Sequence, residues 1–328
     1  MQAPSSIKSA PTHARQPSPH VRHLQPTCRS GAEFFRYQTA CPPIAWERVI
    51  GIGVYHLAAL LAFVPYFFSW TGVVLAFLGY SLLTILGINI GYHRLLAHRG
   101  LTCSKRIEHV LAFLGLLALQ FGPAYWVAIH RRHHHFADRP EDPHAPVGNF
   151  LWSHFGWILV HGPNANRDSV LRRYARDLVK DDFYVWMEKQ GRWFWLIVLL
   201  WSVFFIAGWA VELVAGGTMQ EAIQFGASLL VWGVFVRTVI VWHVTWSVNS
   251  WSHHAGYRTY ETADDSRNNV LVGLLAHGEG WHNNHHAHPR YARHGRRWWE
   301  IDTTWWVIKA MAWLGLVTDV VLPTADEE

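Results

Sequence analysis

Cysteine is scarce in this sequence. The 328 residues include three cysteines, an odd number with no C-x-x-C pair among them. This argues against a disulfide scaffold and against zinc or iron–sulfur sites built from thiolates. The zinc-peptidase motif H-E-x-x-H is also absent, which makes a zinc peptidase a weak alternative. We expect the functional side of the protein to face a reducing compartment.

Formal charge is missing from long stretches of the chain. Residues 49–92 contain no Asp, Glu, Lys or Arg, and the whole chain is 51% hydrophobic with 20 tryptophans. Because a membrane-spanning helix needs about 20 apolar residues, this stretch is long enough for two. A second pair follows, separated by a loop without basic residues. The predicted fold is an all-α integral membrane protein with four transmembrane helices in two hairpins, at about residues 49–70, 72–92, 193–211 and 222–251.

A further uncharged run, Val110–Ile129, is also 20 residues long. If it crossed the membrane, the histidine-rich segments at its two ends would lie on opposite faces. We therefore predict a re-entrant or interfacial helix there. We expect a break at Gly122-Pro123, because proline lacks the N–H that a helix interior requires.

Basic residues are distributed asymmetrically between the loops. Of the 28 Lys and Arg residues, 14 lie between His93 and Arg192, six precede Val49 and seven follow Trp251, whereas the two hairpin turns contain none. By the positive-inside rule, the large loop, both termini and a His-rich cap are predicted on the cytosolic side, with an organelle membrane as an alternative location. The net charge of +5 follows from this topology and requires no nucleic acid partner.

The two ends of the chain differ from its middle. Residues 1–45 are rich in Pro, Ser and His without apolar periodicity, which predicts a mobile tail. An organelle transit peptide would have a similar acid-poor composition and stays an alternative. Residues 46–323 form the predicted membrane domain, and residues 324–328 form an acidic tail.

Histidine is abundant, with 23 residues, and eight of them form three clusters that follow apolar segments. The second and third clusters read H-x-x-H-H, so their imidazoles share a helix face and can be aimed at one point. The first reads H-x-x-x-x-H, and residues five apart lie about 140° apart on an ideal α-helix. That pair can converge only if it flanks two metals or if the helix ends near Ala97. The clusters are His93 and His98; His130, His133 and His134; and His282, His285 and His286.

A fourth element, Asn249 to His253, lies at the end of the last predicted span. Its two end residues are four apart and share a helix face. With His253 the set has nine imidazoles, which is too many for one zinc ion but suits two metal ions that keep positions open for O2. Imidazole suits iron, copper, nickel and zinc, so the ligand type does not identify the metal.

The remaining histidines are expected to have other roles. His243, in the middle of a span, is predicted to be packed or hydrogen-bonded rather than a ligand. Four are predicted as surface residues near the membrane interface: His20, His23, His109 and His161. Seven lie near the clusters and either support the ligands or form polar surface: His135, His144, His154, His254, His277, His288 and His294.

Together these motifs resemble the membrane fatty acyl desaturases, specifically their Δ9, stearoyl-CoA-type branch. Residues 278–286, G-E-G-W-H-N-N-H-H, are similar to the third histidine box of that family, and residues 249–253 to its N-S-x-x-H element. Asp142-Pro143-His144 also looks like a family segment. Residues 256–262, G-Y-R-T-Y-E-T, most resemble the cyanobacterial and plant-type Δ9 acyl-lipid or acyl-CoA desaturases. The resemblance extends over residues 46–323.

The resemblance implies an O2-dependent enzyme that inserts a cis double bond, at Δ9, into a saturated acyl chain carried on CoA or a glycerolipid. It also implies two iron ions and, at Asn249, a metal-bound water. The chain lacks a His-Pro-Gly-Gly haem motif, so the electron donor would be a separate protein of ferredoxin or cytochrome b5 type. The implied iron ligands are His93, His98, His130, His133, His134, His253, His282, His285 and His286.

Two other functions share parts of this pattern. A diiron fatty acid or alkane hydroxylase has similar boxes, but the N-S-x-x-H element and the third box favour desaturation. A His-rich metal transporter would place its ligands near the middle of its spans, where this chain has only His243 and Arg237. Four basic residues could hold a phosphate-bearing head group, although the positive-inside bias explains them as well: Arg167, Arg172, Arg173 and Arg258.

Overall fold

The structure is a computed structural model that describes residues 42–145, 149–161, 167–189 and 192–323. The predicted tail, apart from residues 42–45, and the acidic end lie outside the described residues. Nearly all the regular structure is helical. Two short strands, β1 (Thr102–Cys103) and β2 (Val317–Thr318), pair antiparallel and join distant parts of the chain.

Four helical stretches are long and apolar enough to cross a membrane, as the sequence predicts. The first and third each contain one long α-helix, and the second and fourth also contain a π-helical part. The stretches are Trp46–Phe63 (α1, Trp46–Ala59; η1, Leu60–Phe63), Trp70–Ala97 (α2, Trp70–Leu82; η3, Leu83–Ala97), Phe194–Val214 (within α8, Arg192–Val214) and Met219–His253 (α9, Met219–Leu230; η6, Val231–Val236; α10, Arg237–Ser250; η7, Trp251–His253).

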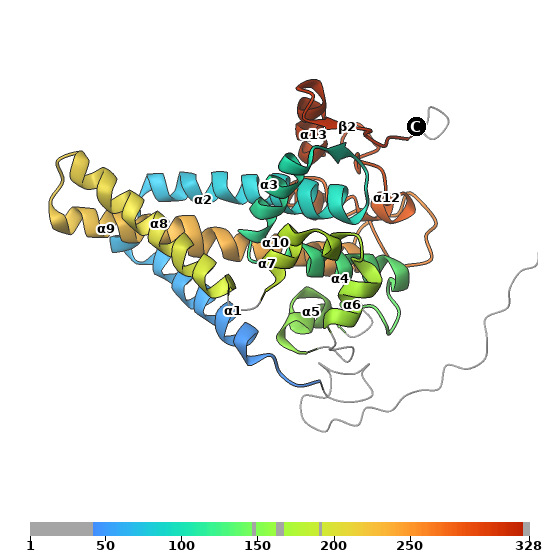
Figure 1. The fold of residues 1–328 in the computed structure, drawn as a ribbon, viewed down its shortest axis with the longest axis horizontal. Coiled ribbons are helices and arrows are strands. Elements are labelled where there is room, and N and C mark those ends of the chain that lie inside the picture. Colours follow the sequence, from blue (N-terminus) through green and yellow to red (C-terminus); the bar gives the residue numbers. More distant parts are fainter. Residues whose placement is uncertain (1–41, 146–148, 162–166, 190–191, 324–328) are drawn as a thin grey trace, which may run out of the picture.

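The long helices extend together from one end of the molecule, and the shorter helices gather at the other end (Figure 1). The most apolar windows of the second and fourth stretches are 44% and 61% buried, against 6% and 11% for the first and third. The outer helices therefore expose large apolar side chains, such as Leu57 and Trp195, each 69% exposed. An apolar surface of this extent is unfavourable in water and suits contact with lipid.

The connection between the first two stretches is longer than the spans predicted at about residues 49–70 and 72–92 allow. The helix ends at Phe63, and the short helix η2 (Pro65–Phe67) follows. Because Pro65 has no N–H, it cannot continue the preceding helix. The Ser69 side chain then accepts a hydrogen bond from the N–H of Gly72 and caps the start of α2.

The uncharged run Val110–Ile129 is divided between two helices and is not among the four membrane-length stretches. α3 (Lys105–Leu116) ends before Leu119 and Phe121, which adopt positive φ angles of 55° and 74°. α4 (Pro123–Phe136) then starts with proline in its first turn. The predicted break at Gly122-Pro123 is confirmed, and it lets α4 leave the direction of α3.

A buried arginine joins the second stretch to the shorter helices. Arg94 is 1% exposed and pairs with Glu279 at 2.9 Å and with Asp302 at 3.0 Å. Because an unpaired charge would be costly there, these contacts fix η3 against the segments that precede α12 and α13. The shorter helices are α5 (Phe150–His154), η4 (Gly156–Leu159), α6 (Arg167–Tyr174), η5 (Leu178–Lys180), α7 (Asp182–Glu188), α11 (Val270–Leu275), α12 (His282–Ala287) and α13 (Thr303–Trp313).

Candidate metal centre

The nine histidines singled out in the sequence come together in two adjacent groups. Within each group the nearest ring nitrogens lie within 4.8 Å of one another. The groups touch where the rings of His134 and His286 approach to 4.5 Å between centroids. The first group is His93, His98, His130, His134 and His285, and the second is His133, His253, His282 and His286.

The first box converges because its helix is not an α-helix. In the π-helix η3 each N–H bonds to the carbonyl five residues earlier, and the N–H of His98 bonds to the carbonyl of His93 at 3.1 Å. Residues five apart therefore lie on the same side of the helix instead of about 140° apart. The two imidazole centroids are 4.8 Å apart. π-helical turns are rare and are frequent at functional sites.

The three imidazoles of an H-x-x-H-H box do not point at one site. This corrects the expectation from their spacing. In α4, His130 and His134 belong to the first group, while His133 belongs to the second. In α12, His285 belongs to the first group and the histidines on either side of it belong to the second. On an α-helix, residues at i+3 and i+4 point about 100° apart. Each of these helices therefore contributes to both groups.

Carboxylates hold four of the rings from outside. The Nδ1 atoms of His93, His133, His253 and His286 lie 2.6, 2.8, 2.9 and 2.9 Å from carboxylate oxygens. Such partners fix the tautomer of an imidazole and turn Nε2 toward a metal. Two of these acids lie in the sequence motifs named above, whereas the other two lie outside them and carry no sequence signal. The carboxylates belong to Glu279, Asp142, Asp138 and Asp264, in the order of the histidines.

The Nε2 atoms at the centre face one another. This arrangement is unfavourable for neutral rings with nothing between them. When Nδ1 of His133 and of His286 donates its hydrogen to a carboxylate, both Nε2 atoms carry lone pairs, and these atoms lie 3.3 Å apart. Two nitrogens bound at right angles to one metal, each at about 2.1 Å, would lie about 3 Å apart. A cation between them removes the repulsion. The donor set therefore fits metal ions that prefer imidazole.

Burial favours the neutral form of several rings in this centre. It lowers the pKa of His134, His282 and His285 well below the usual value, and neighbouring histidines lower it further. Burial also lowers the pKa of His286 to about 4. Burial opposes a charged His133 too, but the Asp142 carboxylate outweighs it and raises that pKa. Neutral imidazole is the form that binds a metal.

Other histidines lie outside the two groups. His144 adjoins His133 and Asp142, and the ring of His294 lies 4.6 Å from that of His285. His109, predicted at the surface, is partly exposed and is bonded to Asp181 at 3.0 Å. His243 is hydrogen-bonded, as predicted. The predicted residues His20 and His23 lie outside the described residues.

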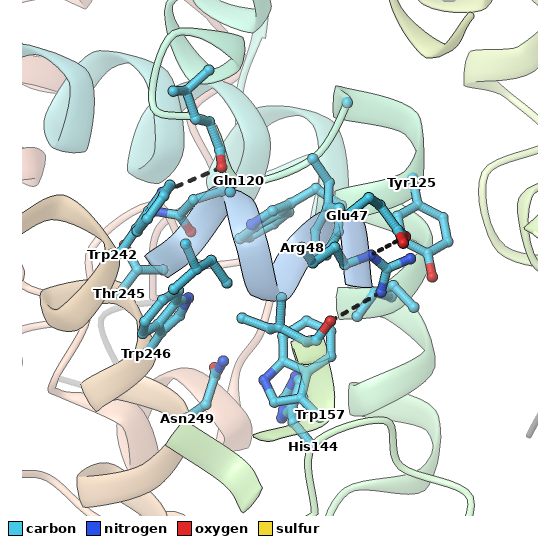
Figure 2. Close-up of a pocket in the computed structure, with 18 of the residues that line it drawn as sticks. Glu47, Arg48, Gln120, Tyr125, His144, Trp157, Trp242, Thr245, Trp246 and Asn249 are labelled. Carbon is cyan, nitrogen blue, oxygen red and sulfur yellow. Dashed lines mark hydrogen bonds and ion pairs between the residues drawn. The ribbon is translucent and has the colours of Figure 1, made fainter. Parts of the chain in front are cut away.

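An apolar cavity of about 690 Å³ reaches the metal centre (Figure 2). His130 and His144 line one part of it, together with Asn249, which belongs to neither histidine group. Elsewhere its wall includes Trp242 and Trp246. A hydrogen bond of 3.0 Å between the side chains of Gln120 and Thr245 crosses one part of the wall. Cavities of this volume hold one small organic ligand or acyl chain.

Helices of membrane length beside buried histidines that could hold metal ions indicate the class of membrane metalloproteins. Comparison with known proteins identifies the family. The family model described as fatty acid desaturase matches residues 68–317.

Similar proteins cover most of the chain. A protein named sn-1 stearoyl-lipid 9-desaturase from Synechocystis sp. is 42% identical over 279 residues, which are 85% of this chain and 81% of that protein. The sn-2 palmitoyl-lipid 9-desaturase of Nostoc sp. is 40% identical over 283 residues, 85% and 91% of the two chains. Icosanoyl-CoA 5-desaturase of Limnanthes douglasii is 38% identical over 270 residues, 82% and 70% of the two chains.

The chain belongs to the fatty acid desaturase family. The resemblance read from its histidine boxes is confirmed, and the protein is a fatty acyl desaturase, an oxidoreductase of lipid metabolism. The comparisons do not favour the hydroxylase or the metal transporter.

Proposed function

We propose that the protein uses O2 and two iron ions to insert a cis double bond at Δ9 of a saturated acyl chain. The observation that carries the proposal is the pair of histidine groups, with their Nε2 atoms turned inward, at the wall of an apolar cavity. Two similar proteins are named 9-desaturases. The bound iron ions would activate O2, which removes two hydrogens from neighbouring carbons to leave the double bond. Together with two electrons and two protons from outside the substrate, these hydrogens reduce O2 to two molecules of water.

We assign one iron ion to each histidine group. Five imidazoles would hold the first ion, and four the second. Asn249 would complete the second site, which has only four imidazoles, through a water molecule, because it lines the cavity beside the centre. The carboxylates on the outer nitrogens keep the rings oriented while substrate enters and product leaves.

The cavity holds the acyl chain and keeps water away from the centre. Its wall is largely aromatic and aliphatic, so a methylene chain can lie there without polar competition. Within this wall the side chains of Gln120 and Thr245 are hydrogen-bonded to each other, so these two polar groups already have a partner. The protein's contribution to catalysis is then the placement of one C–C bond beside the metals.

The charged end of the cavity favours a glycerolipid as the acyl carrier. Arg48 donates to two backbone carbonyl oxygens and lies 3.6 Å from Glu47. Arg167 pairs with Glu188. Because both cations already have partners, they offer little to the phosphate groups of CoA. A neutral or zwitterionic lipid head group does not require free cations there.

We further propose that the long helices cross the membrane as two hairpins and that the histidine-rich cap lies in the cytosol with both termini. The 28 basic residues support this orientation, because none lies in the two hairpin turns. A separate electron-donor protein of ferredoxin or cytochrome b5 type would supply the two electrons at the cytosolic face.

Expression in a host without its own desaturase tests the function. Membranes carrying the protein should gain monounsaturated chains with the double bond at carbon 9, located by mass spectrometry, and purified protein should hold two iron ions. Supplying stearoyl groups on CoA or on a glycerolipid then identifies the carrier. Hydroxylated chains, or a single tightly bound metal, would contradict the proposal.

A further inference from the structure

Three histidines outside the metal centre form a chain of hydrogen bonds. The Nε2 atoms of His56 and His243 lie 2.9 Å apart, and Nδ1 of His243 lies 3.0 Å from Nε2 of His154. His154 continues the chain through Nδ1, which lies 2.9 Å from the hydroxyl of Ser250. At the other end, Nδ1 of His56 lies 2.8 Å from the carbonyl of Ile52. We call His56, His243 and His154 the imidazole chain.

The imidazole chain packs directly behind the aromatic wall of the cavity. Trp242 and Trp246 line the cavity and stack on each other at 5.7 Å and 17°. The rings of His243 and His154 meet Trp246 edge-on at 5.2 and 5.9 Å. His56 approaches Trp242 at 6.1 Å. The histidines therefore contact both indoles on the side that faces away from the cavity.

The imidazole chain joins three elements that surround the cavity. His56 belongs to α1, His243 to α10 and His154 to α5. α1 contributes Ile52 and Tyr55 to the cavity lining, and α10 contributes the two tryptophans. The contact between His56 and His243 therefore fixes the separation of two walls, and with it the width of the cavity.

The imidazole chain is expected to be rigid at neutral pH. Burial lowers the pKa of His154 to about 4, so its ring is neutral and takes part in hydrogen bonds without a charge. His56 and His243 lie within membrane-length helices, where water is not available as a replacement partner. Breaking a link therefore leaves polar nitrogens without partners and favours a shift of the helices.

We propose that the imidazole chain fixes Trp242 and Trp246 so that one particular C–C bond of the acyl chain lies beside the metal centre. The three histidines are positioning residues, because they neither line the cavity nor belong to the two histidine groups. The proposal rests on the function given above. It adds that the position of the double bond depends on residues behind the cavity wall.

The test compares full-length variants in the desaturase-free host, fed saturated chains of several lengths. His243→Leu removes both links of the central ring, and His243→Gln keeps an amide that can donate and accept. His109→Leu is the matched control, because His109 is also partly buried and hydrogen-bonded but lies away from the cavity. Product positions and chain lengths are measured by mass spectrometry at equal protein amounts.

We expect His243→Leu to lower the ratio of the main double-bond position to its neighbours by roughly threefold to tenfold, as expected for loss of interhelical hydrogen bonds in a membrane. His243→Gln should recover part of this ratio, and His109→Leu should match the wild type. An unchanged ratio in His243→Leu overturns the proposal. If that variant does not accumulate, His56→Leu, which removes only an end link, is judged by the same ratio. Absence of product from the wild type would instead reject the proposed function.

Discussion

The carboxylate behind His286 offers a sharp test of the metal assignment. Asp264 accepts a hydrogen bond from Nδ1 of His286 at 2.9 Å, and it is also bonded to Thr262 and Ser266. Asp264→Asn keeps the size of the side chain but removes its charge. Because partners of this kind tune ligand basicity, we expect the iron affinity of the second histidine group to fall about 10- to 100-fold, or about 1.4 to 2.7 kcal/mol.

The adjacent residue provides the control. Asp265 is exposed, so Asp265→Asn makes the same chemical change without touching a ligand. Iron binding is measured by competition with a chelator, in which the two ions can be removed separately. Asp264→Asn should release one ion at a lower chelator concentration while the other stays, and desaturation should fall in parallel with iron loss. Equal affinities in Asp264→Asn and Asp265→Asn would refute the reasoning.

Three further outcomes follow from the site. His285→Ala, which removes a ligand of the first group, should abolish product while the protein still inserts in the membrane; near-total loss from a His243 substitution would show that the ligand set is wrong. Thr245→Val leaves the Gln120 amide without its 3.0 Å partner and should lower the free energy of unfolding by about 1–3 kcal/mol, measured by thermal unfolding against Thr318→Val on the exposed strand β2. In the metal-free protein, burial lowers the pKa of His286 to about 4, below its unfolded value of 6.5. The unfolded chain therefore binds more protons than the folded one. The free energy of unfolding should fall as the pH drops below about 6.5. A thermal midpoint that is equal or higher at pH 5 than at pH 7.5 contradicts this sign.

The first box shows how far local spacing can be trusted. On an α-helix the spacing of His93 and His98 left their convergence unexplained, and the structure resolves it with a π-helix. Nothing in the residues 83–97 marks this change of helix type. The π-helix packs closely on α3, since a Cβ added at Gly87 would lie 2.6 Å from the backbone nitrogen of Gly115. The convergence of the two rings became visible only in the folded chain.

The carboxylates behind the rings show a second limit. Asp138 and Asp264 are 126 residues apart in the chain, yet both orient rings of the same group. Each is one of 23 acidic residues in the sequence, and no periodicity separates it from a surface residue. Only the folded chain shows which acids meet an imidazole. The imidazole chain from His56 to His154 was invisible for the same reason, since its members belong to three separate elements.

The sequence by itself determined the class of this protein. Long uncharged runs indicate contact with lipid or burial, and nine histidines at the ends of such runs indicate a shared metal centre. Both conclusions follow from residue type and spacing, which are local properties of the sequence. Tertiary structure alone decided how the nine divide into five and four, which acids orient them, and what shapes the cavity beside them. These features depend on contacts between segments far apart in the chain, and their geometry is set by packing rather than by any local pattern.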